Sequence, residues 1–132
     1  MVAADVARLN GKGVATPSRH ALQVSAAVHL LAAHTDSESD PGSWWHVLNH
    51  RCAANAYLRG RTLLALANIA AAEEISFNYN TTEFELSVPF HCWCDASSQR
   101  GPHRVRGYRY LSARERAALD DHVADHLRGR TV

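Results

Sequence analysis

Three short blocks decide the fold: Asn-His-Arg-Cys-Ala-Ala-Asn at 49–55, Glu-Glu-Ile-Ser-Phe-Asn-Tyr at 73–79 and Phe-His-Cys-Trp-Cys at 90–94. An Asn-His pair can hold a polar cofactor, and a tyrosine at the end of a strand can steer a reacting amine. A Cys-x-Cys pair can bind a metal. Each block alone is a weak signal, so the order of the three carries the information.

Length and charge limit the classes of protein that fit. The 132 residues suffice for one compact domain with a core of its own. Because 14 Lys and Arg residues nearly balance 13 Asp and Glu residues, we expect no direct nucleic-acid binding. Three cysteines are an odd number, and no basic residue follows Met1 to begin an export signal, so we expect a reduced, cytoplasmic protein. The longest apolar stretch, 21–33, contains polar residues and is too short to span a membrane.

The residues before the first block predict short elements. Apolar residues at helical spacing predict a helical or frayed lead over 1–10, and 14–16 can form a brief strand. The segment 20–31 alternates as a strand does, although its alanines also permit a helix, and we favour the strand. The acidic, turn-rich stretch 35–43 predicts a surface loop between two halves of one domain.

The residues after the first block predict a hairpin and a further strand. Two apolar runs, 56–58 and 62–67, flank the Arg-Gly-Arg turn at 59–61, which is typical of paired strands. The segment 75–79 is another strand candidate.

The C-terminal segment predicts an amphipathic helix. Ser112 and Glu115 have the spacing of a capping box, in which each side chain bonds to the other residue's backbone amide. Apolar residues then recur at every fourth position: Leu119, Val123 and Leu127. The helix would end near residue 129. His122 and His126 would share one face of it, which we expect to be solvated.

The ordered blocks resemble the C-terminal half of a SET-domain protein lysine methyltransferase of the small bacterial type, with its post-SET segment. That family has Asn-His-Ser-Cys-x-Pro-Asn, then Gly-Glu-Glu-Leu leading to Asp-Tyr, then Cys-x-Cys-Gly with a further cysteine before Arg-Gly. The matching residues here are Asn49-His50-Arg51-Cys52-Ala53-Ala54-Asn55, Ala72-Glu73-Glu74-Ile75 with Asn78-Tyr79, and Cys92-Trp93-Cys94-Asp95 with Arg100-Gly101. Gly11-Lys12-Gly13 is similar to the family's Gly-x-Gly entry.

The resemblance implies a β-rich α+β fold of several short twisted sheets, a β-clip with a pseudoknot, ending in a C-terminal α-helix. A SET-like domain would cover 1–91, with a shortened N-terminal half at 1–43 and the cofactor and catalytic half at 44–91. A post-SET-like segment would cover 92–108, and the C-terminal helix 109–132.

The activity implied by the resemblance is transfer of a methyl group from S-adenosylmethionine to a lysine side chain of a protein or peptide. Tyr79 would be the catalytic residue. Trp93 would lie over the adenine as an aromatic lid, and Phe90 would belong to the pocket. The other residues expected to bind the cofactor are Gly11, Lys12, Gly13, Asn49 and His50.

The family's post-SET segment binds zinc through one cysteine of the Asn-His block and three of the tail. This chain offers three cysteines for such a site: Cys52, Cys92 and Cys94. Gln99 stands at the place of the fourth ligand, and glutamine binds zinc poorly. Either His91 or His103 substitutes for it, or the site is empty.

Two further interpretations are open. The shortened N-terminal half, Ala72 in place of glycine and Gln99 in place of cysteine favour a degenerate SET-like module. Such a module would bind cofactor, a small molecule or a partner protein without methylating lysine. Alternatively, the chain is a small metal-binding interaction domain, or a homodimer of such domains in which a second copy completes the wall that the shortened N-terminal half leaves open.

Overall fold

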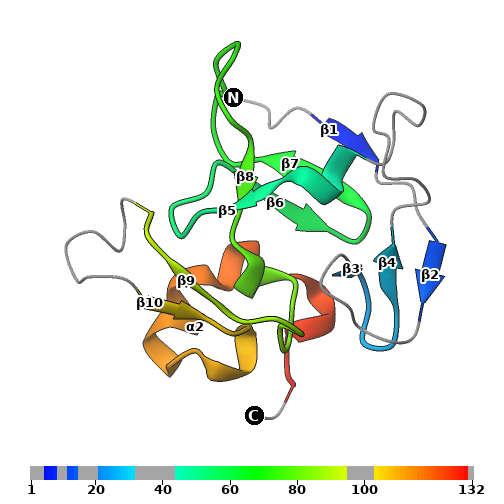
Figure 1. Ribbon diagram of the computed structural model, residues 1–132, viewed down its shortest axis with the longest axis vertical. Helices are drawn as coiled ribbons and strands as arrows, with labels where there is room; N and C mark the ends of the chain where they lie inside the picture. The colour runs from blue at the N-terminus through cyan, green and yellow to red at the C-terminus, as the bar shows by residue number, and fades with distance from the viewer. Residues whose placement is uncertain (1–4, 9–11, 15–20, 32–43, 95–102, 131–132) are drawn as a thin grey trace.

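The computed structural model describes residues 5–8, 12–14, 21–31, 44–94 and 103–130. Within these residues the chain forms three small β-sheets and one short α-helix, joined by single turns of 3-10 helix (Figure 1). The α+β class with several short sheets agrees with the sequence-based prediction. No helix in the described part of the chain is long and apolar enough to cross a membrane.

The largest sheet has five strands in the order β1-β7-β6-β8-β5. β6 and β7 form the predicted antiparallel hairpin, whereas β8 runs parallel to both of its neighbours. The pairing of β8 with β5 brings the first two sequence blocks side by side. The bounds are β1 Asp5–Arg8, β5 Asn49–His50, β6 Ala56–Arg59, β7 Thr62–Ala65 and β8 Ser76–Phe77.

The N-terminal half corrects two expectations. The predicted helical lead over 1–10 is wrong, because residues 5–8 extend as β1 and pair with β7. The segment 20–31 is extended as predicted but folds into two strands instead of one. The second sheet therefore has the antiparallel order β2 (Lys12–Val14), β4 (His29–Leu31), β3 (Ala21–Gln23). The predicted loop at 35–43 lies outside the described residues.

The third sheet pairs β9 (Phe90–Cys92) with β10 (His103–Val105) antiparallel. Two 3-10 turns lie earlier in the chain, η1 (Trp44–Val47) before β5 and η2 (Tyr79–Thr81) after β8. The elements that follow β10 are η3 (Tyr108–Tyr110), α2 (Ala113–Leu119), η4 (Asp120–His122) and η5 (Asp125–Leu127).

The predicted C-terminal helix forms only in part. The capping box of Ser112 and Glu115 is present, but α2 spans seven residues, and the expectation of a helix over 109–132 is wrong. Val123 and Leu127 are buried, as the apolar pattern requires, yet Val123 lies in extended backbone between two 3-10 turns. The pattern correctly marks the buried face but not the conformation that buries it.

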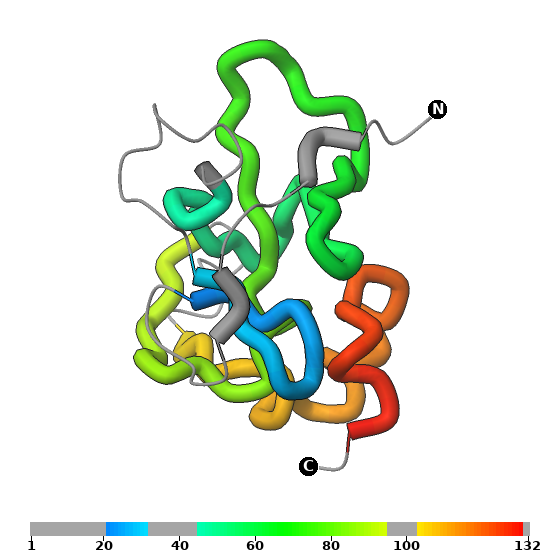
Figure 2. Tube along the Cα trace, turned by 90° about the vertical axis from the view of Figure 1, so that its right-hand side faces the viewer, coloured from blue at the N-terminus to red at the C-terminus, as the bar shows by residue number. Residues whose placement is uncertain are grey.

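Tertiary hydrogen bonds explain why the helix stops. The Arg59 guanidinium donates to the carbonyl oxygens of Asp121 and Val123 at 3.0 and 3.4 Å. The expected solvated histidine face is also wrong, because the His122 ring packs 5.4 Å from that of Tyr57 and His126 is half-buried. These partners replace the bonds that a continuous helix would make to itself. The resulting C-terminal segment lies at the opposite end of the molecule from the β7–β8 loop (Figure 2).

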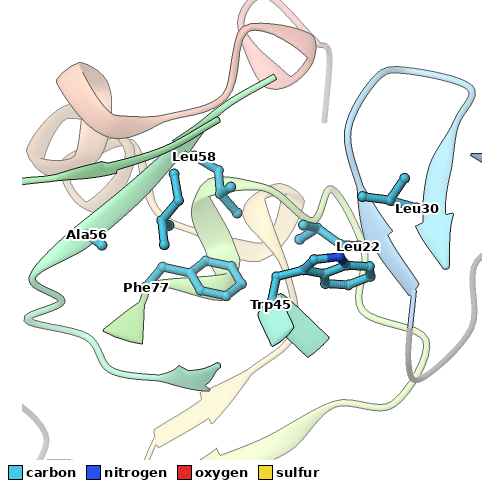
Figure 3. Close-up of a cluster of buried hydrophobic side chains, with 7 residues drawn as sticks. Leu22, Leu30, Trp45, Ala56, Leu58 and Phe77 are labelled. Carbon is cyan, nitrogen blue, oxygen red and sulfur yellow. The ribbon is translucent and has the colours of Figure 1, made fainter. Parts of the chain in front are cut away.

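The hydrophobic core lies between the first two sheets. Each of two hairpins contributes a pair of facing leucines, Leu22 with Leu30 and Leu58 with Leu63, all at most 5% exposed. Trp45 and Phe77 belong to the same buried cluster as the two pairs (Figure 3). Burial of a leucine side chain contributes about 2 kcal/mol, so these pairs hold the two sheets together.

Gly107 marks a close approach between the C-terminal segment and the chain after η2. Its φ is +115°, and a β-carbon there would lie 2.6 Å from the carbonyl oxygen of Phe84 and 2.8 Å from Cα of Glu85. We expect Gly107→Ala to lower the free energy of unfolding by about 3 kcal/mol, measured by urea denaturation. Gly60→Ala is the control, since φ is +59° there but no atom lies within 4 Å, and it should cost about 1 kcal/mol. Equal losses would contradict the close approach.

Candidate functional site

The first two sequence blocks meet at the parallel pairing of β5 with β8, where Asn49 faces Ser76 and His50 faces Phe77. The Asn55 side chain reinforces the contact. Its Oδ1 accepts the Ser76 amide at 2.9 Å, and its Nδ2 donates to the Glu74 carbonyl at 2.8 Å. The first and last residues of the Asn-His block thus both bind the second block.

The two glutamates of the second block face the first block. Asn49 Nδ2 donates to Glu74 Oε1 at 2.7 Å, and Asn55 Nδ2 donates to Glu73 Oε1 at 3.1 Å. The Ala70 amide donates to Glu73 Oε2 at 2.9 Å, and this bond is the main reason why the pKa of Glu73 lies below its usual value. The Glu-Glu pair therefore fixes the asparagines of the Asn-His block.

His50 is held in one tautomer by Tyr79. The Tyr79 backbone amide donates to His50 Nδ1 at 3.0 Å, and a backbone N–H can only donate. Nδ1 therefore carries the lone pair and Nε2 carries the proton. Burial, with a smaller contribution from nearby His103, lowers the pKa of His50 to about 4, so the ring is neutral at physiological pH.

A cavity of about 630 Å³ lies beside β5 and η2, within the range that small-molecule sites occupy. Tyr79 stands on its wall, where the hydroxyl donates to the Leu48 carbonyl at 2.5 Å. Phe90 lines the cavity and meets the His50 and Tyr79 rings edge-on, at 5.6 and 5.8 Å between centroids. The polar residues that line the cavity are His46, Asn49, His50, Tyr79, Glu83 and Ser87.

A second cluster of ligand-type side chains adjoins this cavity. Ligand atoms of His50, Cys52, Cys92 and His103 lie within 4.8 Å of one another. Sγ of Cys52 lies 3.1 Å from Nε2 of His103 and 3.9 Å from Sγ of Cys92. Two thiolates bound to one tetrahedral zinc at about 2.3 Å lie about 3.8 Å apart, so the observed spacing fits that ion.

The Cys94 thiol lies beside this cluster, whereas His91 does not belong to it. The Cys94 thiol interacts with those of Cys52 and Cys92, and the Cys94 amide donates to Cys92 Sγ at 3.4 Å. His91 is exposed and lies opposite Arg104, whereas its neighbour Cys92 faces His103 across the sheet. Of the two histidines that could replace the missing cysteine, the structure brings His103 to the thiols.

The tautomer of His50 decides its part in the cluster. Because Nδ1 accepts the Tyr79 amide, Nε2 bears a hydrogen and has no lone pair for a metal. Nε2 lies 3.4 Å from Cys52 Sγ, so His50 is placed to donate a hydrogen bond to that sulfur. Without His50, the cluster offers Cys52, Cys92 and His103 as ligands that could hold one metal ion, and the neighbouring Cys94 thiol is the candidate for a fourth.

Two of the remaining predicted residues lie on the second sheet. Lys12 and Gly13 are on β2, the edge strand of the second sheet, and Gly11 lies outside the described residues. Trp93 is 77% exposed and is not among the described residues that line the cavity. Its assignment as a lid stays a prediction.

Sequence reasoning missed the buried polar segment 78–83, Asn-Tyr-Asn-Thr-Thr-Glu. Apart from the half-buried tyrosine, all its residues are buried, and Glu83 lines the cavity. A run of polar residues directly after a buried strand that ends at a candidate catalytic tyrosine was the available signal. Polar runs of this composition are far more often surface turns, so the burial of this segment was not predicted.

Comparison with protein-family models, with curated proteins and with solved structures finds no match to this chain.

The loop that carries the two glutamates holds one alanine at positive φ. Ala72 has φ +66°, in the left-handed region that costs an alanine about 1–2 kcal/mol. We expect Ala72→Gly to raise the free energy of unfolding by about 1 kcal/mol, because relief of strain outweighs the greater chain entropy of glycine. Ala71→Gly is the control and should lower it by about 0.5–1 kcal/mol. Denaturation of both variants tests this, and a loss at both positions would contradict the strain.

Proposed function

We propose that this protein is an S-adenosylmethionine-dependent methyltransferase of the SET type, with its fold, that acts on a lysine side chain of a protein or peptide. The observation that carries the proposal is the position of Tyr79. Its phenol stands on the wall of a cavity of ligand size, tied to the Leu48 carbonyl, next to the Asn49-His50 strand. The three ordered sequence blocks support it, because two of them meet at this wall and Phe90 of the third also lines the cavity.

The Tyr79 hydroxyl suits the task of orienting an amine. Its hydrogen is committed to Leu48, so the oxygen lone pairs are free to accept an N–H from an incoming amine. Burial, assisted by the charge of Glu83, raises the pKa of Tyr79 and keeps it a neutral phenol at physiological pH. A fixed acceptor aligns the lone pair of the nitrogen for in-line attack, a positioning effect worth several kcal/mol.

Asn49 and His50 would hold the cofactor, which when bound supplies an electrophilic methyl group on a sulfonium. Both residues line the cavity from β5, and their side chains are fixed by Glu74 and by the Tyr79 amide. Leu22, Trp45 and Phe77 line the same cavity and give it apolar walls. Fixed polar groups on an otherwise apolar wall are typical of cofactor sites.

Cys52, Cys92, Cys94 and His103 would hold zinc in a structural role. The ion would join the turn after β5 to the β9–β10 sheet. Metal binding in such small segments supplies much of the free energy of ordering. Tyr79 would benefit indirectly, because His50 connects its amide to Cys52.

A second candidate is a binding module of the same fold that does not methylate lysine. Trp93 favours it, since a tryptophan that is 77% exposed is a typical contact residue for a protein partner. This module would bind cofactor or a partner through the same cavity.

Tyr79→Phe separates the two candidates. In calorimetry the wild type should bind S-adenosylmethionine, and on a peptide library with a fixed central lysine it should transfer labelled methyl. Tyr79→Phe should lower turnover by about 10²-fold, because it removes the acceptor, while cofactor affinity changes little. Tyr57→Phe makes the same change outside the cavity, where the ring packs on His122, and should leave turnover unchanged.

No heat with a well-folded wild-type sample would overturn the proposed function. Cofactor binding without methyl transfer would favour the binding module. Unchanged turnover in Tyr79→Phe would remove Tyr79 from its role.

The zinc assignment is tested by metal analysis and by Co²⁺ spectroscopy of the reduced protein. We expect one metal per chain, with thiolate charge-transfer absorption that Cys52→Ser weakens. His103→Ala should lower zinc affinity by at least about 10-fold, since ligation requires the deprotonated nitrogen it supplies. His91→Ala is the matched control on the facing strand, and its affinity should equal that of the wild type. Equal binding by His103→Ala and the wild type would contradict the four-ligand set.

A further inference from the structure

Glu83 is a buried carboxyl group on the wall of the cavity. The residue is 6% exposed, and its Oε1 accepts a hydrogen bond from the backbone amide of Gln23 at 2.7 Å. The Thr82 hydroxyl lies 3.4 Å from the same oxygen. The other oxygen, Oε2, lies 4.0 Å from Nε2 of His29, beyond hydrogen-bond distance. One oxygen is therefore fixed by the protein, and the other is left for a further partner.

Within the described part of the chain, the groups packed around Glu83 provide no permanent positive charge. His29 on β4 and His126 on η5 both have lowered pKa values, chiefly because they are buried, and are neutral at physiological pH. Tyr79 on η2 is a neutral phenol in this range. Among the described residues that line the cavity there is no lysine or arginine, and Glu83 alone can carry a negative charge. Among the described lining residues, Glu83 is therefore the group that can attract a cation.

Burial raises the pKa of Glu83 to about 7, and the hydrogen bonds from Gln23 and Thr82 only partly oppose the rise. A carboxyl group that titrates near physiological pH can both hold and release a proton there. Structure alone does not require a carboxylate at this position. An amide would accept the Gln23 hydrogen bond equally well, without the several kcal/mol that a buried charge costs.

We propose that Glu83 receives the substrate's ammonium group in the cavity and takes its proton before methyl transfer. This role rests on the proposed function. It makes Glu83 the general base of the methyl transfer, a task separate from the orienting role of Tyr79. Glu83 lies four residues after Tyr79, and its backbone amide donates to the Tyr79 carbonyl at 3.0 Å, so one turn of chain places both on the same wall.

The proton balance of the step is simple. The substrate R–NH₃⁺ transfers one proton to the Glu83 carboxylate, giving R–NH₂ and a neutral carboxyl group. The nitrogen lone pair then forms the N–C bond to the methyl group as the S–C bond breaks, giving R–NH₂–CH₃⁺ and the neutral thioether. Glu83 returns its proton to water, so each turnover releases one proton.

Glu83→Gln tests the role, since glutamine keeps an Oε1 acceptor for the Gln23 amide. In the wild type, kcat/KM should fall tenfold per pH unit below pH about 7, because a protonated Glu83 cannot accept a proton. In the variant the amine must lose its proton to water, so the rise with pH should continue to about 10, the pKa of a lysine amine. At pH 7 the expected loss of kcat/KM is about 10²- to 10³-fold.

Two variants control for structure. Glu85→Gln alters an exposed glutamate bound to Arg109 and Tyr110, and its pH profile should match the wild type. Glu83→Asp keeps the carboxyl group one methylene further back, so it should retain the limb near pH 7 at a lower rate. Circular dichroism confirms that each variant is folded.

The outcomes separate this role from the proposed function. If Glu83→Gln turns over at the wild-type rate and its activity falls below the same pH, the role of Glu83 is overturned. The proposed methyltransferase activity is not affected by that outcome. A wild type that binds no cofactor and transfers no methyl to the lysine peptides overturns both. If Glu83→Gln is unfolded, a Glu83→Asp variant without the limb near pH 7 likewise overturns the role.

Discussion

The buried polar segment 78–83 is the constraint on which the rest of the structure depends. Three of its hydrogen-bonding groups are taken up by two distant parts of the chain, one at 107 and one at 124–126. Asn80 Oδ1 accepts the Gly107 amide, the Thr81 carbonyl accepts the Ala124 amide, and the Thr82 carbonyl accepts His126 Nε2, at 3.0, 2.8 and 2.6 Å. Buried polar groups cost about 1–3 kcal/mol each when left unpaired, so the three contacts must form together.

The same segment also fixes the candidate site. Gln23 binds it from β3 with both its backbone and its side chain, donating to Glu83 Oε1 and accepting the Phe84 amide at 2.9 Å. Tyr79 and Glu83 are therefore held by a chain whose backbone partners come from both halves of the protein. A cavity wall built this way holds its polar groups in place before any ligand arrives, which is the condition for electrostatic preorganisation.

Local signals in the sequence were sufficient where the interacting residues are close in the chain. The hairpin of β6 and β7 follows from a turn at Gly60, and the capping box from Ser112 and Glu115. The spacing of the blocks also led to the residues that the structure gathers at β5, η2 and β9. The identity of the fold and of the reaction stays a prediction.

Sequence reasoning failed where distant partners decide the conformation. Apolar residues at every fourth position can be buried by a continuous helix or by an irregular segment. Here Arg59 binds the carbonyl oxygens of such a segment, so the apolar repeat could not predict that the helix ends after α2. The strand at 5–8 depends on its pairing with β7. The burial of the polar residues 78–83 depends on hydrogen-bond partners 27 to 60 residues away. No local propensity encodes such contacts.

The parallel pairing of β5 with β8 also has a consequence for how the molecule reaches its native state. Each strand has only two residues, and a loop of 25 residues separates them. Closing this loop therefore costs chain entropy, while the short strands form few hydrogen bonds to compensate for it. The β6–β7 hairpin inside that loop can form first and shorten the search. The cavity wall at β5 and η2 is then among the last parts to assemble. During synthesis it cannot assemble before residue 77 has left the ribosome.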